Sequence, residues 1–174
     1  MNYTINIYET DSENTARFIL GNKLEKPLFV VGLNPSTANE KVPDPTIRKV
    51  MGFAERKGFD SFVMLNLYPQ RATNPNDLHQ DIDNNLLSEN LKYISNLLEN
   101  EQEFVMLASW SEKVKLRKYF GECIKSIHSI TKKPNVSWVK LGELTKRGHP
   151  RHPLYSRYNL EFTDFDFDNY ISKL

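Results

Sequence analysis

Four short apolar runs, each rich in β-branched or aromatic residues, constrain most strongly how this chain can fold. They span residues 28–33, 62–67, 104–108 and 136–141. Runs of this length and composition are typical of strands. Because they lack polar alternation, we expect these strands to be buried on both faces, as in a parallel sheet that helices cover.

Helical patterns separate the predicted strands. The first helix is expected to begin at Asp44, a favourable N-cap residue, with Pro45 in its first turn, and to end at Gly58. The second covers about 85–100, and the third runs from near Ser111 to about Phe120. The order β-α-β-α-β-α-β predicts an α/β fold with three layers, α/β/α, around a central, mainly parallel four-stranded sheet.

Smaller elements are expected at both ends of this core, which covers about residues 26–157. Segments 3–8 and 17–20 predict a peripheral N-terminal hairpin. The acidic C-terminal tail, 161–174, alternates Phe and Asp in its first half, which indicates a strand at a sheet edge. A chain of 174 residues is expected to form a single domain, 1–174.

Composition excludes several classes of protein. The lone cysteine, Cys123, cannot form an intrachain disulfide, which favours a reducing compartment. No stretch is long and apolar enough to cross a bilayer, so we expect a cytoplasmic protein without a membrane partner. Neither a phosphate-binding P-loop nor a Gly-x-Ser-x-Gly elbow is present, which disfavours ATP hydrolysis and serine esterase chemistry, and no cofactor is expected.

Charge is distributed unevenly, although the formal net charge is only +1. Residues 74–103 contain seven acids and one lysine, whereas residues 111–157 contain twelve Lys or Arg and three acids. A basic block of this length can face phosphates, which would suit DNA or a nucleotide. A solvated helix face and strand edge explain the same pattern equally well.

Polar residues follow all four predicted strands. In an open parallel sheet the ligand crevice lies outside the carboxyl ends of the strands, so these loops are expected to meet at one edge. Candidate residues for binding a substrate there are Gly32, Pro35, Ser36, Thr37, Asn66, Tyr68, Arg71, Ser109, Arg151 and Leu154. The predicted convergence of four loops is more specific than any single motif among them.

Asn34 is the first candidate for a catalytic role. A side-chain amide at a rigid strand end has a carbonyl that can orient water and an NH₂ group that can bind a carbonyl. Asn34 therefore suits the positioning of a nucleophile, although Asn-Pro also forms ordinary turns.

Candidate binding groups also follow the predicted strands 62–67 and 104–108. Asn66 could read a ligand edge, Tyr68 could stack on it and Arg71 could clamp an anion. Alternatively, Asn66 ties two loops, Tyr68 packs in the core and Arg71 pairs with an acid. Ser109 could line the pocket or cap a helix.

His149 and His152 are the remaining catalytic candidates, because histidine can titrate near neutrality and can stabilise a developing negative charge. Lys146, Arg147 and Arg151 surround them in the sequence. The His-x-x-His spacing could suggest a metal, but no nearby acid or cysteine completes a ligand set, so no metal site is expected.

Several spaced motifs together resemble the uncharacterised family called domain of unknown function 1643. The resemblance extends from about residue 28 to 155. It rests on Leu33-Asn34-Pro35-Ser36-Thr37-Ala38, Asp44-Pro45-Thr46-Ile47-Arg48, Asn66-Leu67-Tyr68, Arg71-Ala72-Thr73 and His152-Pro153-Leu154-Tyr155. It indicates a family without assigning a reaction.

Residues 30–36, Val-Val-Gly-Leu-Asn-Pro-Ser, are also distantly similar to the Gly-Ile-Asn-Pro-Gly motif of the uracil- and mismatch-specific DNA glycosylases, with Ser36 in place of the glycine. This resemblance implies a uracil-DNA-glycosylase-like fold and makes Asn34 the residue that positions the attacking water. Either His149-Pro150 or His152-Pro153-Leu154 could match the closing motif that grips DNA or the departing base. Tyr68 and Phe53 both remain candidates for stacking on the base.

Three functions are therefore open. The first is hydrolysis of an N-glycosidic bond in DNA or a nucleotide, where a base in duplex DNA would be flipped out with Leu154 as a wedge. The second is a non-catalytic module that binds nucleic acid or a nucleotide. The third is a small-molecule enzyme on the same scaffold, since one fold supports many activities.

Overall fold

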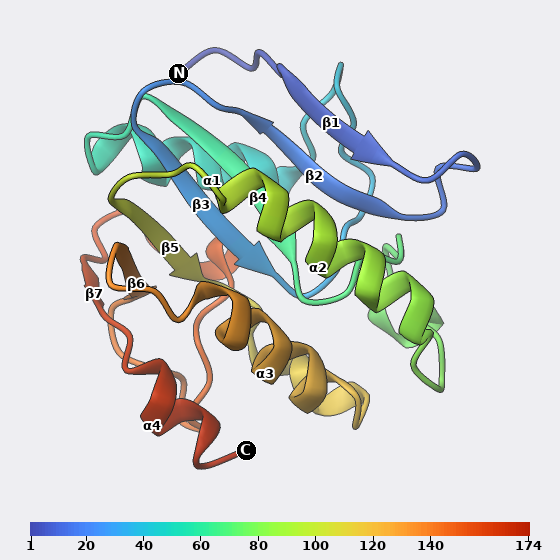
Figure 1. Ribbon diagram of the computed structural model, residues 1–174. Coiled ribbons are helices and arrows are strands. Elements are labelled where there is room, and N and C mark those ends of the chain that lie inside the picture. The colour runs from blue at the N-terminus through green and yellow to red at the C-terminus, as the bar shows by residue number, and fades with distance from the viewer.

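A seven-stranded mixed sheet forms the centre of the molecule (Figure 1). The computed structural model describes residues 1–174, and the strand order across the sheet is β1-β2-β4-β3-β5-β6-β7. The strands are β1 (Ile7–Thr10), β2 (Arg17–Asn22), β3 (Pro27–Gly32), β4 (Ser61–Asn66), β5 (Phe104–Ala108), β6 (Val136–Leu141) and β7 (Phe162–Asp164). The predicted α/β class is confirmed, and the sheet has seven strands where four were expected.

The additional strands come from the two ends of the chain. Strands β3, β4, β5 and β6 arise from the four apolar runs, and β3 pairs in parallel with β4 and β5, as β5 does with β6. The expected N-terminal hairpin forms, because β1 pairs antiparallel with β2. It is not merely peripheral, since β2 also pairs antiparallel with β4, and β7 extends the other edge by pairing antiparallel with β6.

Two of the predicted helices lie where the sequence placed them. Helix α1 (Pro45–Arg56) begins after Asp44, whose Oδ1 accepts from the amide of Ile47 at 2.8 Å, and Gly58 follows its end with φ of +76°. Helix α2 (Asn84–Leu98) begins after Asp83, whose carboxylate accepts from two amides of the first turn. Both helices therefore start at a side-chain cap that satisfies otherwise unpaired N–H groups.

The third predicted helix is wrong in its position. A 3₁₀ segment, η2 (Glu112–Leu116), occupies most of the predicted range, and α3 (Phe120–Thr131) begins only where the prediction ended. Arg117 separates them in an extended conformation, and its guanidinium donates to the carbonyls of Asn76, Leu78 and His79. These hydrogen bonds tie the segment to the β4–α2 connection, which contains η1 (Pro75–Asp77), and so interrupt the helix.

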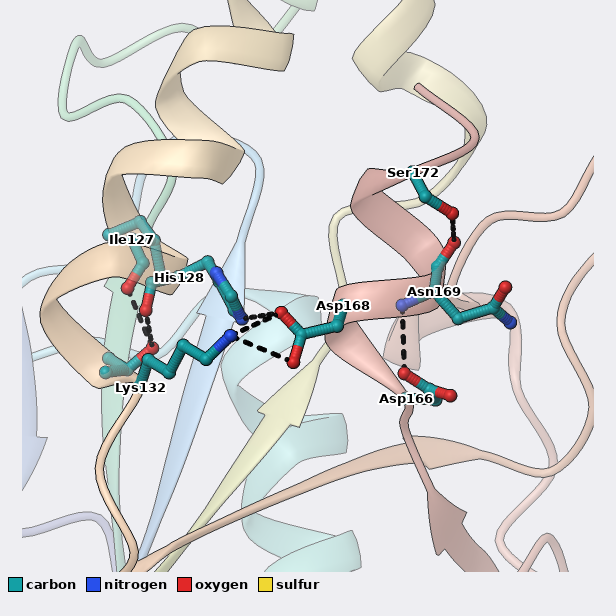
Figure 2. Close-up of polar contacts among 8 residues, drawn as sticks. Ile127, His128, Lys132, Asp166, Asp168, Asn169 and Ser172 are labelled. Atoms are coloured by element: carbon teal, nitrogen blue, oxygen red, sulfur yellow. Dashed lines mark hydrogen bonds and ion pairs between the residues drawn. The ribbon is translucent and has the colours of Figure 1, made fainter.

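The acidic tail forms the expected edge strand and then a short helix. After β7, Asp166 caps α4 (Phe167–Ile171) by accepting from the amide of Asn169 at 2.9 Å. Asp168 fastens α4 to α3, because its carboxylate lies 2.8 Å from Lys132 Nζ and 3.2 Å from His128 Nε2 (Figure 2). The hydrogen bond from Lys132 lowers the pKa of Asp168.

Helices cover both faces of the sheet. In Figure 1, α2 and α3 lie in front of the sheet and α1 lies behind it. Helix α1 buries Ile47, Val50, Phe53 and Ala54 against one face, whereas α2, α3 and α4 pack on the larger core of the other face. None of the helices combines the length and apolarity that a membrane span requires.

The direction of β2 matters for the site. Because β2 runs antiparallel to β4, its first residue, Arg17, lies beside the chain that leaves the carboxyl end of β4. The Arg17 amide donates to the Pro69 carbonyl at 2.9 Å, and Ala16 forms a bridge with Gln70. The β2 N-terminus therefore reaches the edge at which the parallel strands end.

Gly21→Ala tests the close approach of β2 to β4. A Cβ atom at this position would lie 2.6 Å from the Phe62 carbonyl oxygen and 2.7 Å from Val63 Cα, so the two strands would have to separate. We expect the substitution to lower the free energy of unfolding by about 1–3 kcal/mol in urea denaturation. Gly121→Ala in α3 is the control, because it meets no atom within 4 Å and should be neutral or stabilising. Equal effects of the two substitutions would contradict the expected crowding.

Candidate functional site

A cavity of about 280 Å³ lies at the carboxyl edge of the parallel strands. Its wall comes from the β3–α1 loop, the first turn of α1, the β4–α2 loop, the segment after β5 and the long connection between β6 and β7. The predicted site residues that line it are Gly32, Asn34, Ser36, Thr37, His152 and Leu154. This is the edge at which ligand crevices of open α/β sheets form, and the volume lies near the lower end of the range for small-molecule pockets.

Asn34 is held in one orientation by main-chain carbonyls. Its Nδ2 donates to the carbonyls of Pro35 at 2.9 Å and Ala72 at 2.8 Å, with a longer contact of 3.5 Å to that of Gln70. A group that faces acceptors must be the NH₂, so the amide cannot rotate without losing these bonds. The half-buried side chain thereby keeps its Oδ1, which has no hydrogen-bond partner within the chain, as a fixed acceptor at the cavity wall.

His152 presents a neutral imidazole to the same cavity. It caps η3 (Pro153–Tyr155), where its Nδ1 accepts from the amide of Leu154 at 3.2 Å, so the proton of the neutral ring resides on Nε2. Burial, aided by the charge of Lys113, lowers the pKa of His152 to about 4. At neutral pH, His152 is therefore a hydrogen-bond donor at Nε2 and carries no charge.

Several cavity residues were not predicted from the sequence. Arg17 and Asp44 are buried in its wall, Lys113 lies at its rim, and Tyr155 lines it while remaining 79% exposed. Asp44 and Tyr155 belong to motifs on which the family resemblance rests, and Lys113 lies in the basic block of residues 111–157, so these three carried a signal in the sequence. Arg17 belongs to a strand remote from all the recognised loops.

Ser111 adds local backbone strain at this wall. Its φ of +64° and ψ of −176° fall in a region that is nearly restricted to glycine. Its Oγ accepts from the amide of Lys113 at 3.3 Å, which stabilises the turn that follows. Strain of this kind, of about 1–3 kcal/mol, concentrates at functional sites, which agrees with the position of Ser111 in the cavity.

Two predicted residues lie beneath the cavity and do not line it. Asn66 is fully buried, and one end of its side-chain amide faces only carbonyl acceptors; with the nitrogen placed at that end, it donates to the Asn34 carbonyl at 3.3 Å and supports the loop from below. Ser109 is also fully buried, and its Oγ donates to the Val31 carbonyl at 2.8 Å. Asn66 thereby makes the contact between loops that was the alternative to ligand binding, whereas Ser109 neither lines the cavity nor caps a helix.

Four further predicted residues are engaged elsewhere. Tyr68 is buried in the core, with its hydroxyl 2.8 Å from His79 Nδ1. Arg71 donates to Asn14 Oδ1, Tyr8 Oη and the carbonyls of Ser36 and Ala38, so it clamps loops and pairs with no acid. Pro35 is buried outside the cavity lining, and Arg151 is exposed with its Nε on the Glu143 carbonyl.

His149 lies in a second cavity, of about 310 Å³, and not in the first. Trp110 Nε1 donates to Tyr170 Oη at 3.0 Å, and the same hydroxyl is hydrogen-bonded to His149 Nδ1 at 2.8 Å. His149 Nε2 is buried without a partner. Burial, together with Lys115, lowers the pKa of His149. Nowhere in the molecule do three His, Cys, Asp or Glu side chains gather in a way that could hold a metal ion.

Comparison with known proteins identifies a family and no relative of known activity. The model of the family described as "Protein of unknown function (DUF1643)" matches residues 17–154. No curated protein and no solved structure matches the chain. The first resemblance seen in the sequence is thereby confirmed, whereas the resemblance to DNA glycosylases is not shown by any match.

The pKa of His152 predicts a loss of stability in acid. The unfolded chain protonates this histidine below about pH 6.5, whereas the folded chain does so only near pH 4, so protons favour unfolding between these values. We expect His152 to cost on the order of 3 kcal/mol of unfolding free energy when the pH falls from 7.5 to 4. His152→Asn, which keeps an acceptor for the Leu154 amide, should flatten this part of the profile. Urea denaturation at several pH values checks this, and parallel profiles for the two proteins would contradict it.

Tyr170→Phe tests the hydrogen-bonded chain that reaches His149. The substitution leaves Trp110 Nε1 and His149 Nδ1 without their partner in a buried environment. We expect the free energy of unfolding to fall by about 1–3 kcal/mol. Tyr155→Phe is the matched control, because this hydroxyl is on an exposed side chain and makes no hydrogen bond in the structure. A Tyr170→Phe protein as stable as the control would show that the chain does not contribute.

Proposed function

The chain belongs to the DUF1643 family of proteins of unknown function, and from the geometry of the cavity that Asn34 lines we propose that it hydrolyses the N-glycosidic bond of a nucleotide or nucleic acid. The observation that carries the proposal is the orientation of Asn34. Its Nδ2 is occupied by two carbonyls at 2.8–2.9 Å, which leaves Oδ1 as a fixed acceptor beside a cavity of small-ligand size.

A fixed carbonyl acceptor suits the orientation of a water nucleophile. Asn34 Oδ1 accepts a hydrogen bond from the water and so orients a lone pair of the water oxygen toward the anomeric carbon of the sugar. The water oxygen bonds to that carbon as the bond to the base nitrogen breaks, and the electron pair leaves with the base. One water proton remains on the new sugar hydroxyl, and the other is lost to solvent and replaced by one on the released base.

His152 is placed in this proposal beside the departing base. Its Nε2–H donates to the negative charge that develops on the base, and a low pKa keeps the ring in the neutral donor form over the physiological range. Tyr155, exposed at the cavity wall and 5.8 Å between ring centroids from His152, supplies a face on which the base can stack. Tyr155 thus takes the stacking role for which Tyr68 and Phe53, both buried in the two cores, had been considered.

The surrounding charge favours an anionic substrate. The cavity residues Arg17 and Lys113 are cationic, and only Asp44 among the cavity residues is acidic. Lys113 also begins the basic block that covers residues 111–157. Cations around a concave site raise the local concentration of phosphate-bearing ligands.

Asn34→Ala tests the proposed reaction. We expect base release to fall about 100-fold or more, since the water loses its positioning group, while substrate binding is retained. The measurement is chromatographic detection of free base from deoxynucleotides and from oligonucleotides that contain uracil or a mismatched thymine. Asn85→Ala, at an exposed position of α2, is the control and should release base at the wild-type rate.

Retained binding by Asn34→Ala separates a chemical role from a folding defect, because the substitution also removes two loop contacts. A folded Asn34→Ala protein that releases base normally would remove Asn34 from the mechanism. If the wild-type protein binds DNA with a steep salt dependence and releases no base, it is a binding module. If nucleobase ligands fail to raise the melting temperature and another class of metabolite succeeds, it is a small-molecule enzyme.

A further inference from the structure

Arg17 is the more heavily buried of the two cations that line the cavity beside Asn34. It is 2% exposed, although it lies at the start of β2, and it lines the cavity together with the β3–α1 loop. Arginine is rarely buried to this extent unless an acid pairs with it. The question is therefore which groups of the protein bond to this guanidinium.

Groups of the protein accept only one hydrogen bond from the Arg17 guanidinium. The guanidinium has five N–H donors, of which Nη1 donates to the Ala38 carbonyl at 3.0 Å. Nε is buried without a partner, and Nη2 makes no hydrogen bond in the structure. No carboxylate lies within 4.0 Å of the side chain.

The neighbouring charges do not compensate the positive charge of Arg17. Arg71 donates to the same Ala38 carbonyl at 3.2 Å, which brings two guanidinium groups together. Asp44 attracts Arg17 from beyond salt-bridge distance, and its Oδ1 is occupied by the Ile47 amide. Burial, with the nearby Arg71, lowers the pKa of Arg17 only to about 10, so the group is charged at neutral pH. A charged, buried and under-bonded guanidinium is costly unless an anion completes it.

The rest of the cavity can complete an oxyanion site. Ser36, Thr37, Thr46, Thr73 and Ser111 supply hydroxyl groups around it, and Lys113 supplies a second cation at the rim. With His152 neutral, the two cations and Asp44 give the lining a net charge of +1. Planar guanidinium forks and hydroxyl groups are the donors that bind phosphate oxygens with directional hydrogen bonds.

We propose that Arg17 anchors a terminal phosphate of the ligand, so that the substrate is a nucleoside monophosphate. The proposal rests on the proposed function for the nucleoside part and on Arg17 for the phosphate. A group that is 2% exposed can be reached by a chain end that stops there, whereas a backbone phosphodiester has to leave the site in two directions. The cavity of about 280 Å³ also suits one small ligand better than a polymer.

The test compares ligands that differ only in the phosphate. Isothermal titration calorimetry on Asn34→Ala protein, which prevents turnover, uses the four common deoxynucleoside 5′-monophosphates, the matching nucleosides, and an oligonucleotide without terminal phosphates. We expect at least one monophosphate to bind tenfold or more tightly than its nucleoside. Adding Arg17→Met should abolish that difference and change nucleoside affinity less than twofold.

A stability measurement separates binding from a structural role. Without ligand, Arg17→Met should melt at the same temperature as the parent protein or higher, because it removes an uncompensated buried charge while Ala38 keeps its hydrogen bond from Arg71. Arg56→Met, at the opposite end of α1 from the cavity, is the matched control and should leave the preference for phosphate unchanged. A lower melting temperature for Arg17→Met with an unchanged preference for phosphate would overturn the proposal.

The remaining outcomes distinguish this inference from the proposed reaction. Monophosphate binding that depends on Arg17, in a wild-type protein that releases no base, would remove the glycosidic reaction and leave the phosphate anchor in place. Base release by a protein with equal affinity for nucleoside and monophosphate would remove the phosphate anchor and leave the glycosidic reaction in place. An oligonucleotide that binds as tightly as the monophosphate and loses affinity with Arg17→Met would show that Arg17 binds a backbone phosphodiester, and this would overturn the assignment of a terminal phosphate.

Discussion

The parallel pairing of β3 with β4 on one side and β5 on the other is the constraint on which the rest of the site depends. Because these strands end at the same edge, the connections that follow them must diverge there and leave a concave surface. Asn34 then closes this surface by bonding the β3–α1 loop to the Ala72 carbonyl of the β4–α2 loop, while Asn66 supports it from beneath. The cavity is therefore a consequence of strand register and two side-chain amides, and does not require a movable element.

The parts of this structure that follow from local sequence were predictable, and those that depend on contacts distant in sequence were not. Apolar runs and an Asp-Pro start predicted the four parallel strands and α1, and the strand-end rule placed Asn34 at the cavity. The pairing of β2 with β4 has no local signature, so Arg17 could not be assigned to the site. Residue type also failed to separate a binding group from a buried one, as Ser109 shows, because a hydroxyl in a core and a hydroxyl in a pocket look alike until their partners are known.

The two histidines illustrate the same limit at short range. His149 and His152 are three residues apart in an irregular loop, where side-chain direction follows no fixed period, and the structure sends them to different cavities. Trp110 lies between these environments, since it lines the first cavity and donates to Tyr170 Oη, which is hydrogen-bonded to His149 in the second. Burial lowers the pKa of both rings, so both favour the neutral form for the same physical reason despite their separation.

The uncompensated charge of Arg17 links the stability of the protein to the kind of ligand that the cavity can bind. A site that keeps His152 neutral and holds Asp44 as a helix cap has little negative charge to offer Arg17, although burial strengthens every electrostatic interaction around that guanidinium. Such a cation destabilises the empty protein and stabilises an anionic complex by the same interaction. Proteins tolerate under-bonded groups of this kind mainly where function requires them, and strain at Ser111 in the same wall points in the same direction. The cavity therefore has the character of a site whose polar groups are balanced only when a ligand is bound.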